Sequence, residues 1–203
     1  AAVPRPSGDS VGATTPGLSR LPRTAGLPLS RSDVSSSFAG RLLVPALATV
    51  AIVLQAQVHL AIGVPGHRGL IWLSALALVA LYSGRGWTLG TGIPASALTL
   101  AIGTGNAGPL GVVPYVVAAF LLELAVSVRI TQRHPAWIIP MAAGIHLVAL
   151  LPALVKSLTV GVRLGAFASG MLVPILLHVA FGAIAGILAW LAQRALLADR
   201  ARA

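Results

Sequence analysis

The apolar part of this chain contains few side chains that could bind a ligand or carry a proton. Between residues 41 and 194 the only carboxylate is Glu123, and His59, His146 and His178 stand within long apolar runs. An ionisable group is costly to bury in apolar surroundings unless it has a partner. Each of these residues is therefore a candidate for ligand contact, proton transfer or hydrogen bonding between helices.

Gln55 and His59 stand four residues apart, so on a helix they share one face. They could contact a ligand, or they could hydrogen-bond a neighbouring helix, as glutamine and histidine often do in membranes. Glu123 could carry a proton, hold a cation, pair with an interior histidine, or serve as a structural ion partner near Arg129. The sequence leaves these alternatives open.

His146 and His178 lie near the centres of two successive apolar runs, and with His59 they raise the alternative of haem or metal binding. A bis-histidine haem needs paired ligands at equal depth, and a second such pair is missing. We therefore expect no metal and no cofactor. Glu123 and His178 are interpreted as further intramembrane polar residues that serve either function or packing.

The elements that would hold these side chains are long apolar helices. The chain has 57% hydrophobic and 9% charged residues, too little charge for the surface of a soluble domain. An apolar helix needs about 20 residues to cross a bilayer, and the alternation typical of barrel strands is missing. The sequence predicts an all-α polytopic membrane protein, a bundle of six transmembrane helices: Leu42–Ile62, Gly69–Tyr82, Trp87–Ile102, Val112–Val128, Ala136–Val155 and Ala166–Leu191.

The division between the third and fourth spans rests on glycine and proline. Residues 103–111 hold four glycines and one proline, a composition that ends helices and favours turns. With the N-terminus inside, eleven of the 14 basic residues lie on the cytoplasmic side, and Arg68, Lys156 and Arg163 lie outside. We expect both termini to be cytoplasmic.

Composition also divides the chain into segments. Residues 1–40 are rich in proline and serine and are predicted to form a disordered cytoplasmic leader. Residues 41–193 form the six-helix domain, and residues 194–203 form a basic cytoplasmic tail. The absence of cysteine excludes disulfides and thiolate metal sites, and no basic cluster indicates a nucleic-acid partner.

Catalytic motifs are missing. The chain has no Walker A loop, no His-Glu-x-x-His and no Gly-x-Ser-x-Gly, and one intramembrane carboxylate cannot perform paired acid–base catalysis. We expect a binding or transport protein and not an enzyme. Small residues at helical spacing, Gly182-xxx-Gly186 and Ala97-xxx-Ala101, predict closely packed helices.

Three segments, in this order along the chain, resemble the substrate-binding (S) component of an energy-coupling factor (ECF) vitamin transporter. Leu76–Gly90, in which glycines flank Arg85, resembles the family's turn between helices two and three. Gly108–Tyr115 resembles its glycine and proline loop leading into helix four. His178–Gly186 resembles the small-residue stretch of helix six.

One departure concerns helix one, where the family often carries Ala-xxx-Ala to dock on the coupling protein. Here Ala46, Ala48, Ala51 and Ala56 are each followed, four residues later, by a residue other than alanine.

The resemblance implies six helices with cytoplasmic ends in the plasma membrane of a prokaryote. It implies capture of a small nutrient, vitamin-like or heteroaromatic, for ATP-driven import. The implied partners are that nutrient, the lipid bilayer, a coupling membrane subunit and two ATPase subunits. The alternative from another class is a non-catalytic structural or assembly subunit of a larger membrane complex. A membrane protein with histidine-ligated haem or metal is a further alternative.

In that family the ligand lies near the outer face. The site residues that the resemblance implies are Asn106, Tyr115 and His146. Those added from residue type and depth alone are Gln55, His59 and Trp72.

Overall fold

The structure of the protein is a computed structural model that describes residues 31–58, 64–103, 108–161, 163, 165 and 169–202. Within these ranges the protein is all-helical and contains no β-strand. In chain order the elements are α1 Arg31–Gln57, α2 Gly69–Tyr82, α3 Trp87–Ile102, η2 Pro109–Val112, α4 Val113–Ser127, α5 Arg129–Arg133, η3 Pro135–Trp137, α6 Ile138–Ile145, η4 His146–Leu150, α7 Leu151–Thr159 and α9 Leu172–Arg200.

Three helical stretches in the described part of the chain are long and apolar enough to cross a membrane: Pro109–Ser127, Pro135–Thr159 and Leu172–Asp199. Shorter apolar helices cover Arg41–Gln57, Gly69–Tyr82 and Trp87–Ile102. The bounds of α2 and α3 coincide with those predicted for the second and third spans. α1 includes residues 31–40, which the sequence analysis assigned to the leader, and residues 1–30 lie outside the described ranges.

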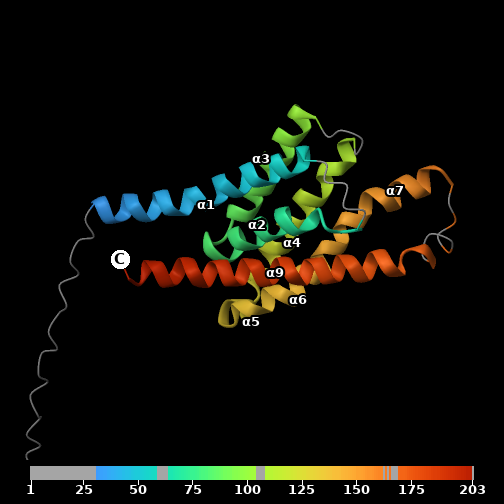
Figure 1. Cartoon of the computed structure of the whole chain (residues 1–203). Coiled ribbons are helices and arrows are strands. Elements are labelled where there is room, and N and C mark those ends of the chain that lie inside the picture. Colours follow the sequence, from blue (N-terminus) through green and yellow to red (C-terminus); the bar gives the residue numbers. More distant parts are fainter. Residues whose placement is uncertain are drawn as a thin grey trace, which may run out of the picture.

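The helices pack around α9 and α2. α9 contacts α6 and α2 most extensively, and α3 packs against α4 and α1. α1 and α9 run in opposite directions, and the start of α1 and the end of α9 lie at the same end of the bundle (Figure 1).

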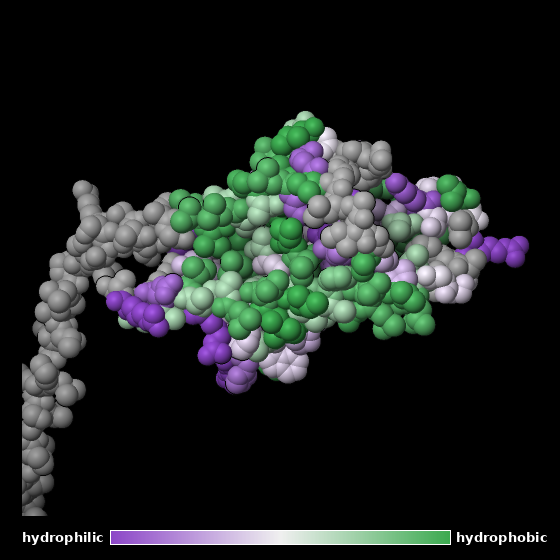
Figure 2. Space-filling model, in the orientation of Figure 1, coloured by the Kyte–Doolittle hydropathy of each residue, from purple (hydrophilic) through white to green (hydrophobic). Residues whose placement is uncertain are grey.

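The surface carries many large apolar side chains. Leu47, Leu54, Ile93 and Leu176 are all more than half exposed, and apolar residues cover much of the face seen in Figure 2, while hydrophilic ones gather at α5 and at the end of α9. A water-soluble surface would not carry such a continuous apolar area. Together with the three long apolar helices, this surface indicates a membrane protein.

α3 buries small and polar residues and exposes its large apolar ones. Its buried residues are Thr88, Thr91, Gly92, Ala95, Ser96 and Thr99. They recur at helical spacing and form one stripe along α3. The prediction for Ala97 and Ala101 is wrong, because both are exposed. Gly92 supplies the close contact instead, since a Cβ there would lie 2.6 Å from Ala119 Cβ.

The Gly182-xxx-Gly186 pair lies in the contact between α9 and α6, as predicted. A Cβ on Gly182 would lie 2.6 Å from the Ala142 carbonyl oxygen, and one on Gly186 would lie 2.7 Å from Ile139 Cα. Such distances leave no room for a side chain, so the two helices approach backbone to backbone.

The fifth predicted span is helical from Pro135 to Thr159 but changes geometry in its middle. His146–Leu150 forms a 3-10 helix between α6 and α7. Pro152, at the start of α7, has no N–H to donate to the carbonyl four residues before it, so a regular α-helix cannot continue through this point. His146 therefore sits at the junction of two helical segments.

We predict that Gly182→Ala lowers stability by about 1–3 kcal/mol, because the new methyl group overpacks the α6–α9 contact. Gly144→Ala is the matched control. Gly144 lies in α6, the helix that Gly182 contacts, but a Cβ there meets nothing within 4 Å. That control should be neutral or slightly stabilising through helix propensity. Thermal unfolding of both variants in detergent checks this, and equal melting temperatures would contradict it.

Candidate functional site

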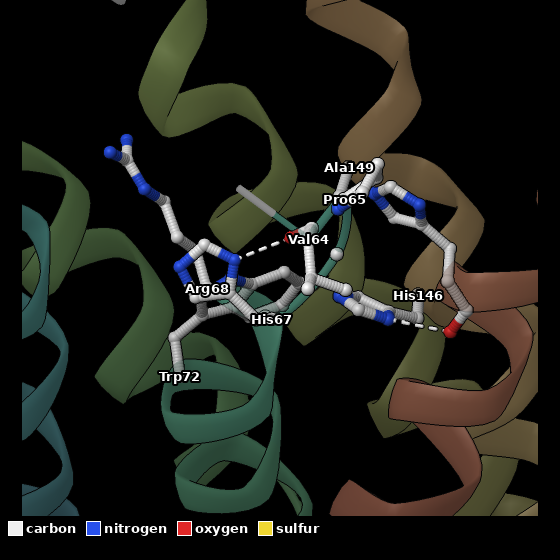
Figure 3. Close-up of a pocket in the computed structure, with 10 residues that line it drawn as sticks. Val64, Pro65, His67, Arg68, Trp72, His146 and Ala149 are labelled. Carbon is white, nitrogen blue, oxygen red and sulfur yellow. Dashed lines mark hydrogen bonds between the residues drawn. The ribbon is translucent and has the colours of Figure 1, made fainter. Parts of the chain in front are cut away.

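A cavity of ≈ 460 Å³ opens where α2 begins. Its lining comes from the segment before α2, from α2 itself, from the α6–η4 junction and from α9. The polar and aromatic residues that line it are His67, Arg68, Trp72, His146 and His178. Figure 3 shows the labelled members of this set around the cavity.

Trp72 lies at the centre of an aromatic and imidazole cluster. Its ring meets Tyr115 edge to face, with centroids 5.4 Å apart and planes at 61°. It meets His146 in a similar way, at 5.8 Å and 64°. Trp72 stands in the first turn of α2 and Tyr115 in the first turn of α4, so both helices begin at the same end of the bundle as the cavity. Edge-to-face contacts of this kind hold ring orientation.

Hydrogen bonds to backbone carbonyls hold the rings of His146 and His178 next to each other. Their ring centroids are 5.0 Å apart, and His146 Nδ1–H donates to the His178 carbonyl oxygen at 2.7 Å. His178 Nδ1–H donates to the Pro174 carbonyl oxygen, also at 2.7 Å. A carbonyl only accepts, so both rings carry a proton on Nδ1. In the neutral form, Nε2 of each ring is then a hydrogen-bond acceptor.

Gly69 makes room for the His146 ring. A Cβ on Gly69 would lie 1.5 Å from His146 Nε2, so no other residue can occupy this position without moving the imidazole. His146 is fully buried, and its Nε2 has no hydrogen-bond partner in the described part of the chain. The ring is thus held on one side by α9 and on the other by the start of α2.

The sequence analysis missed His67 and Arg68 as site residues. His67 Nδ1–H donates to the Val64 carbonyl oxygen at 2.5 Å, which holds its ring beside the cavity. The signal was present: two polar residues follow Pro65-Gly66 directly before an apolar span. A turn next to a span places side chains at the end of the bundle, where a ligand can reach them.

The predicted site residues separate into three groups. Trp72, Tyr115 and His146 are in contact, and His178 joins them. Gln55 does not line this cavity and belongs to a neighbouring groove. His59 and Asn106 lie outside the described residues.

Glu123 lies at another pocket, of ≈ 320 Å³, with Arg85, Thr131 and Gln193. Its Oε1 accepts a hydrogen bond from the backbone N–H of Gly86, the residue that precedes α3. The carboxylate thus satisfies a free N–H at a helix N-terminus, where negative charge is favourable. This hydrogen bond joins α4 to the start of α3, while Glu123 Oε2 is buried and has no partner in the described part of the chain.

The histidine pair does not have the geometry of a haem site. The two rings contact each other, so a porphyrin could enter between them only if α6 and α9 separated. Within the described ranges, no group of three or more histidine, aspartate or glutamate residues is placed to hold a metal ion.

Comparison with protein-family models, with curated proteins and with solved structures finds no match for this chain.

We predict that Glu123→Gln leaves stability nearly unchanged, because the amide oxygen can still accept the Gly86 N–H. Glu123→Ala should cost about 0.5–2 kcal/mol, the usual cost of removing a side-chain acceptor from an N–H at a helix N-terminus, because water can replace part of the lost bond at the exposed Gly86. Thermal unfolding of the two variants in detergent separates them. A loss in Glu123→Gln as large as in Glu123→Ala would show that the charge itself matters.

Proposed function

We propose that this protein captures a small heteroaromatic nutrient within the membrane, as the substrate-binding component of an ATP-driven importer of the energy-coupling factor type. The observation that carries the proposal is that Trp72, His146, His178 and Arg68 line one cavity. An apolar pocket with a few fixed polar groups is the usual form of a small-molecule site. Aromatic edges and imidazoles suit a flat, polar ring.

In this proposal the helical segments make six spans, with both termini in the cytoplasm of a prokaryotic cell. The shared location of the start of α1 and the end of α9 (Figure 1) supports an even number of spans. Exposed Arg129, Arg133 and Arg194 support a cytoplasmic assignment for that side. Energy would come from a coupling membrane subunit and two ATPase subunits, because the chain has no Walker A loop.

The second candidate is a structural or assembly subunit of a larger membrane complex. It is favoured by the way in which polar side chains connect neighbouring helices. Gln193 Nε2–H donates to the Leu81 carbonyl at 2.9 Å, and Gln57 Nε2–H donates to the Gly103 carbonyl at 3.1 Å. Such bonds join helices without a ligand. This candidate does not explain why the Trp72 and His146 rings line a cavity.

Orientation can be tested with single cysteines, because the chain has none of its own. In intact cells, a membrane-impermeant maleimide should label Lys156→Cys and spare Arg129→Cys, since both side chains are exposed but at positions assigned to opposite faces. Labelling of both residues after the membrane is opened is the control. The reverse pattern in intact cells would contradict the proposed orientation.

Ligand capture can be tested by mass spectrometry of small molecules released from the purified protein. A heteroaromatic compound should be recovered in near-stoichiometric amount, and His146→Ala should retain about tenfold less, since a lost buried hydrogen bond costs about 1–3 kcal/mol. His134→Ala, an exposed histidine between α5 and η3 that does not line the cavity, is the control. If no compound is recovered and His146→Ala lowers only the melting temperature, the structural candidate is correct.

A further inference from the structure

A second depression lies beside the cavity, between α1, α2 and α9. Its volume is ≈ 550 Å³. Its apolar wall comes from Leu54 and Val58 of the α1 segment, Ile71 of α2 and Phe181 of α9. We call this depression the α1–α2 groove.

The wall of the groove is open to the surroundings. Leu54 is 60% exposed, Val58 is 52% exposed and Ile71 is 49% exposed. They belong to the apolar surface that indicates a membrane protein, so their natural neighbours are hydrocarbon chains. An acyl chain of the bilayer can enter this groove from the side without leaving an apolar environment.

Two of the residues that line the groove present an acceptor without a partner. Gln55 Oε1 and His67 Nε2 are buried and have no hydrogen-bond partner in the described part of the chain. His67 Nδ1–H already donates to Val64, so in the neutral ring Nε2 is an acceptor. Buried acceptors without partners are rare in folded proteins. A molecule in the groove satisfies them if it brings hydroxyl or N–H groups.

Arg68 also lines the groove and supplies a positive charge. It is exposed, and within the described residues no carboxylate pairs with it. Glu123 is engaged with Gly86 elsewhere. In Figure 3 the Arg68 side chain points away from His146. A guanidinium in this position binds a phosphate through charge-assisted hydrogen bonds.

We propose that the α1–α2 groove binds one phospholipid with an anionic, hydroxyl-bearing headgroup, of the phosphatidylglycerol class. An acyl chain lies along Leu54, Val58 and Ile71, the phosphate lies on Arg68, and the headgroup hydroxyls donate to Gln55 and His67. Phosphatidylcholine fits poorly, because its quaternary ammonium would stand beside Arg68 and its headgroup has no donor. The groove shares His67 and Arg68 with the neighbouring cavity, but the lipid proposal does not require the cavity to take a nutrient.

Native mass spectrometry with equimolar phosphatidylglycerol and phosphatidylcholine, matched in acyl chains, tests this. The detergent-purified full chain should carry one tightly held lipid, with phosphatidylglycerol preferred about tenfold, the value of one or two hydrogen bonds from its headgroup hydroxyls. Arg68→Gln should weaken binding of both lipids, because both carry a phosphate, and should reduce the preference, because the choline of phosphatidylcholine no longer stands beside a positive charge. Lys156→Gln removes an exposed charge outside the groove and should keep the preference.

A second pair of variants tests the acyl chain. Ile71→Trp fills the groove and should reduce binding of both lipids, whereas Leu98→Trp, on the exposed side of α3, should not. Thermal unfolding of each variant checks that it is folded. Equal binding of the two lipids by the wild type would overturn the proposal. So would unchanged lipid binding in Arg68→Gln or in Ile71→Trp.

Discussion

The backbones of α6 and α9 touch, and this contact fixes the positions of most other groups in the molecule. Gly182 and Gly186 leave no volume between the helices. Because the helices are so close, the His146 ring reaches the carbonyl of His178 and the two imidazoles meet. α2 then packs on α9 with Gly69 against His146, and Trp72 follows one turn later. Trp72, His146 and His178, which this contact holds in place, form part of the cavity wall.

Several polar side chains in this bundle donate hydrogen bonds to backbone carbonyl oxygens. Thr91 donates to the carbonyl of Trp87, Ser96 to that of Gly92, and Gln193 to that of Leu81. Backbone acceptors suit an apolar environment, because a hydrogen bond between neutral groups carries no charge to desolvate. Other buried polar atoms have no hydrogen-bond partner in the described part of the chain. Those that line the cavity or the groove are Gln55 Oε1, His67 Nε2 and His146 Nε2, and those elsewhere are Glu123 Oε2 and the hydroxyls of Ser83, Thr88, Thr99 and Thr131.

Much of the helical order could be predicted from the sequence. Charged and glycine-rich joints bound α2 and α3 sharply, because a chain in lipid changes direction where polar residues are tolerated. Trp72, Tyr115 and His146 were chosen as site residues from residue type, depth and the family resemblance, and that role stays a prediction. The contacts between their rings could not be predicted, because they depend on how closely α6 and α9 approach each other.

The errors have related causes. Ala97-xxx-Ala101 has the right spacing for a packed face, but Gly92 on another face allows a closer approach, and the helix turns that face inward. Gln55 was grouped with the cavity by depth alone, although depth says nothing about rotation around the bundle.

The polar stripe of α3 bears on how the protein is assembled. A helix whose inner face holds Thr88, Thr91, Ser96 and Thr99 leaves the insertion machinery with a weaker preference for lipid than one made only of leucine and valine. α4 follows directly in the chain and covers that face. α3 therefore depends on α4 to shield its hydroxyl groups, and we expect the two helices to gain their structure as one cooperative pair.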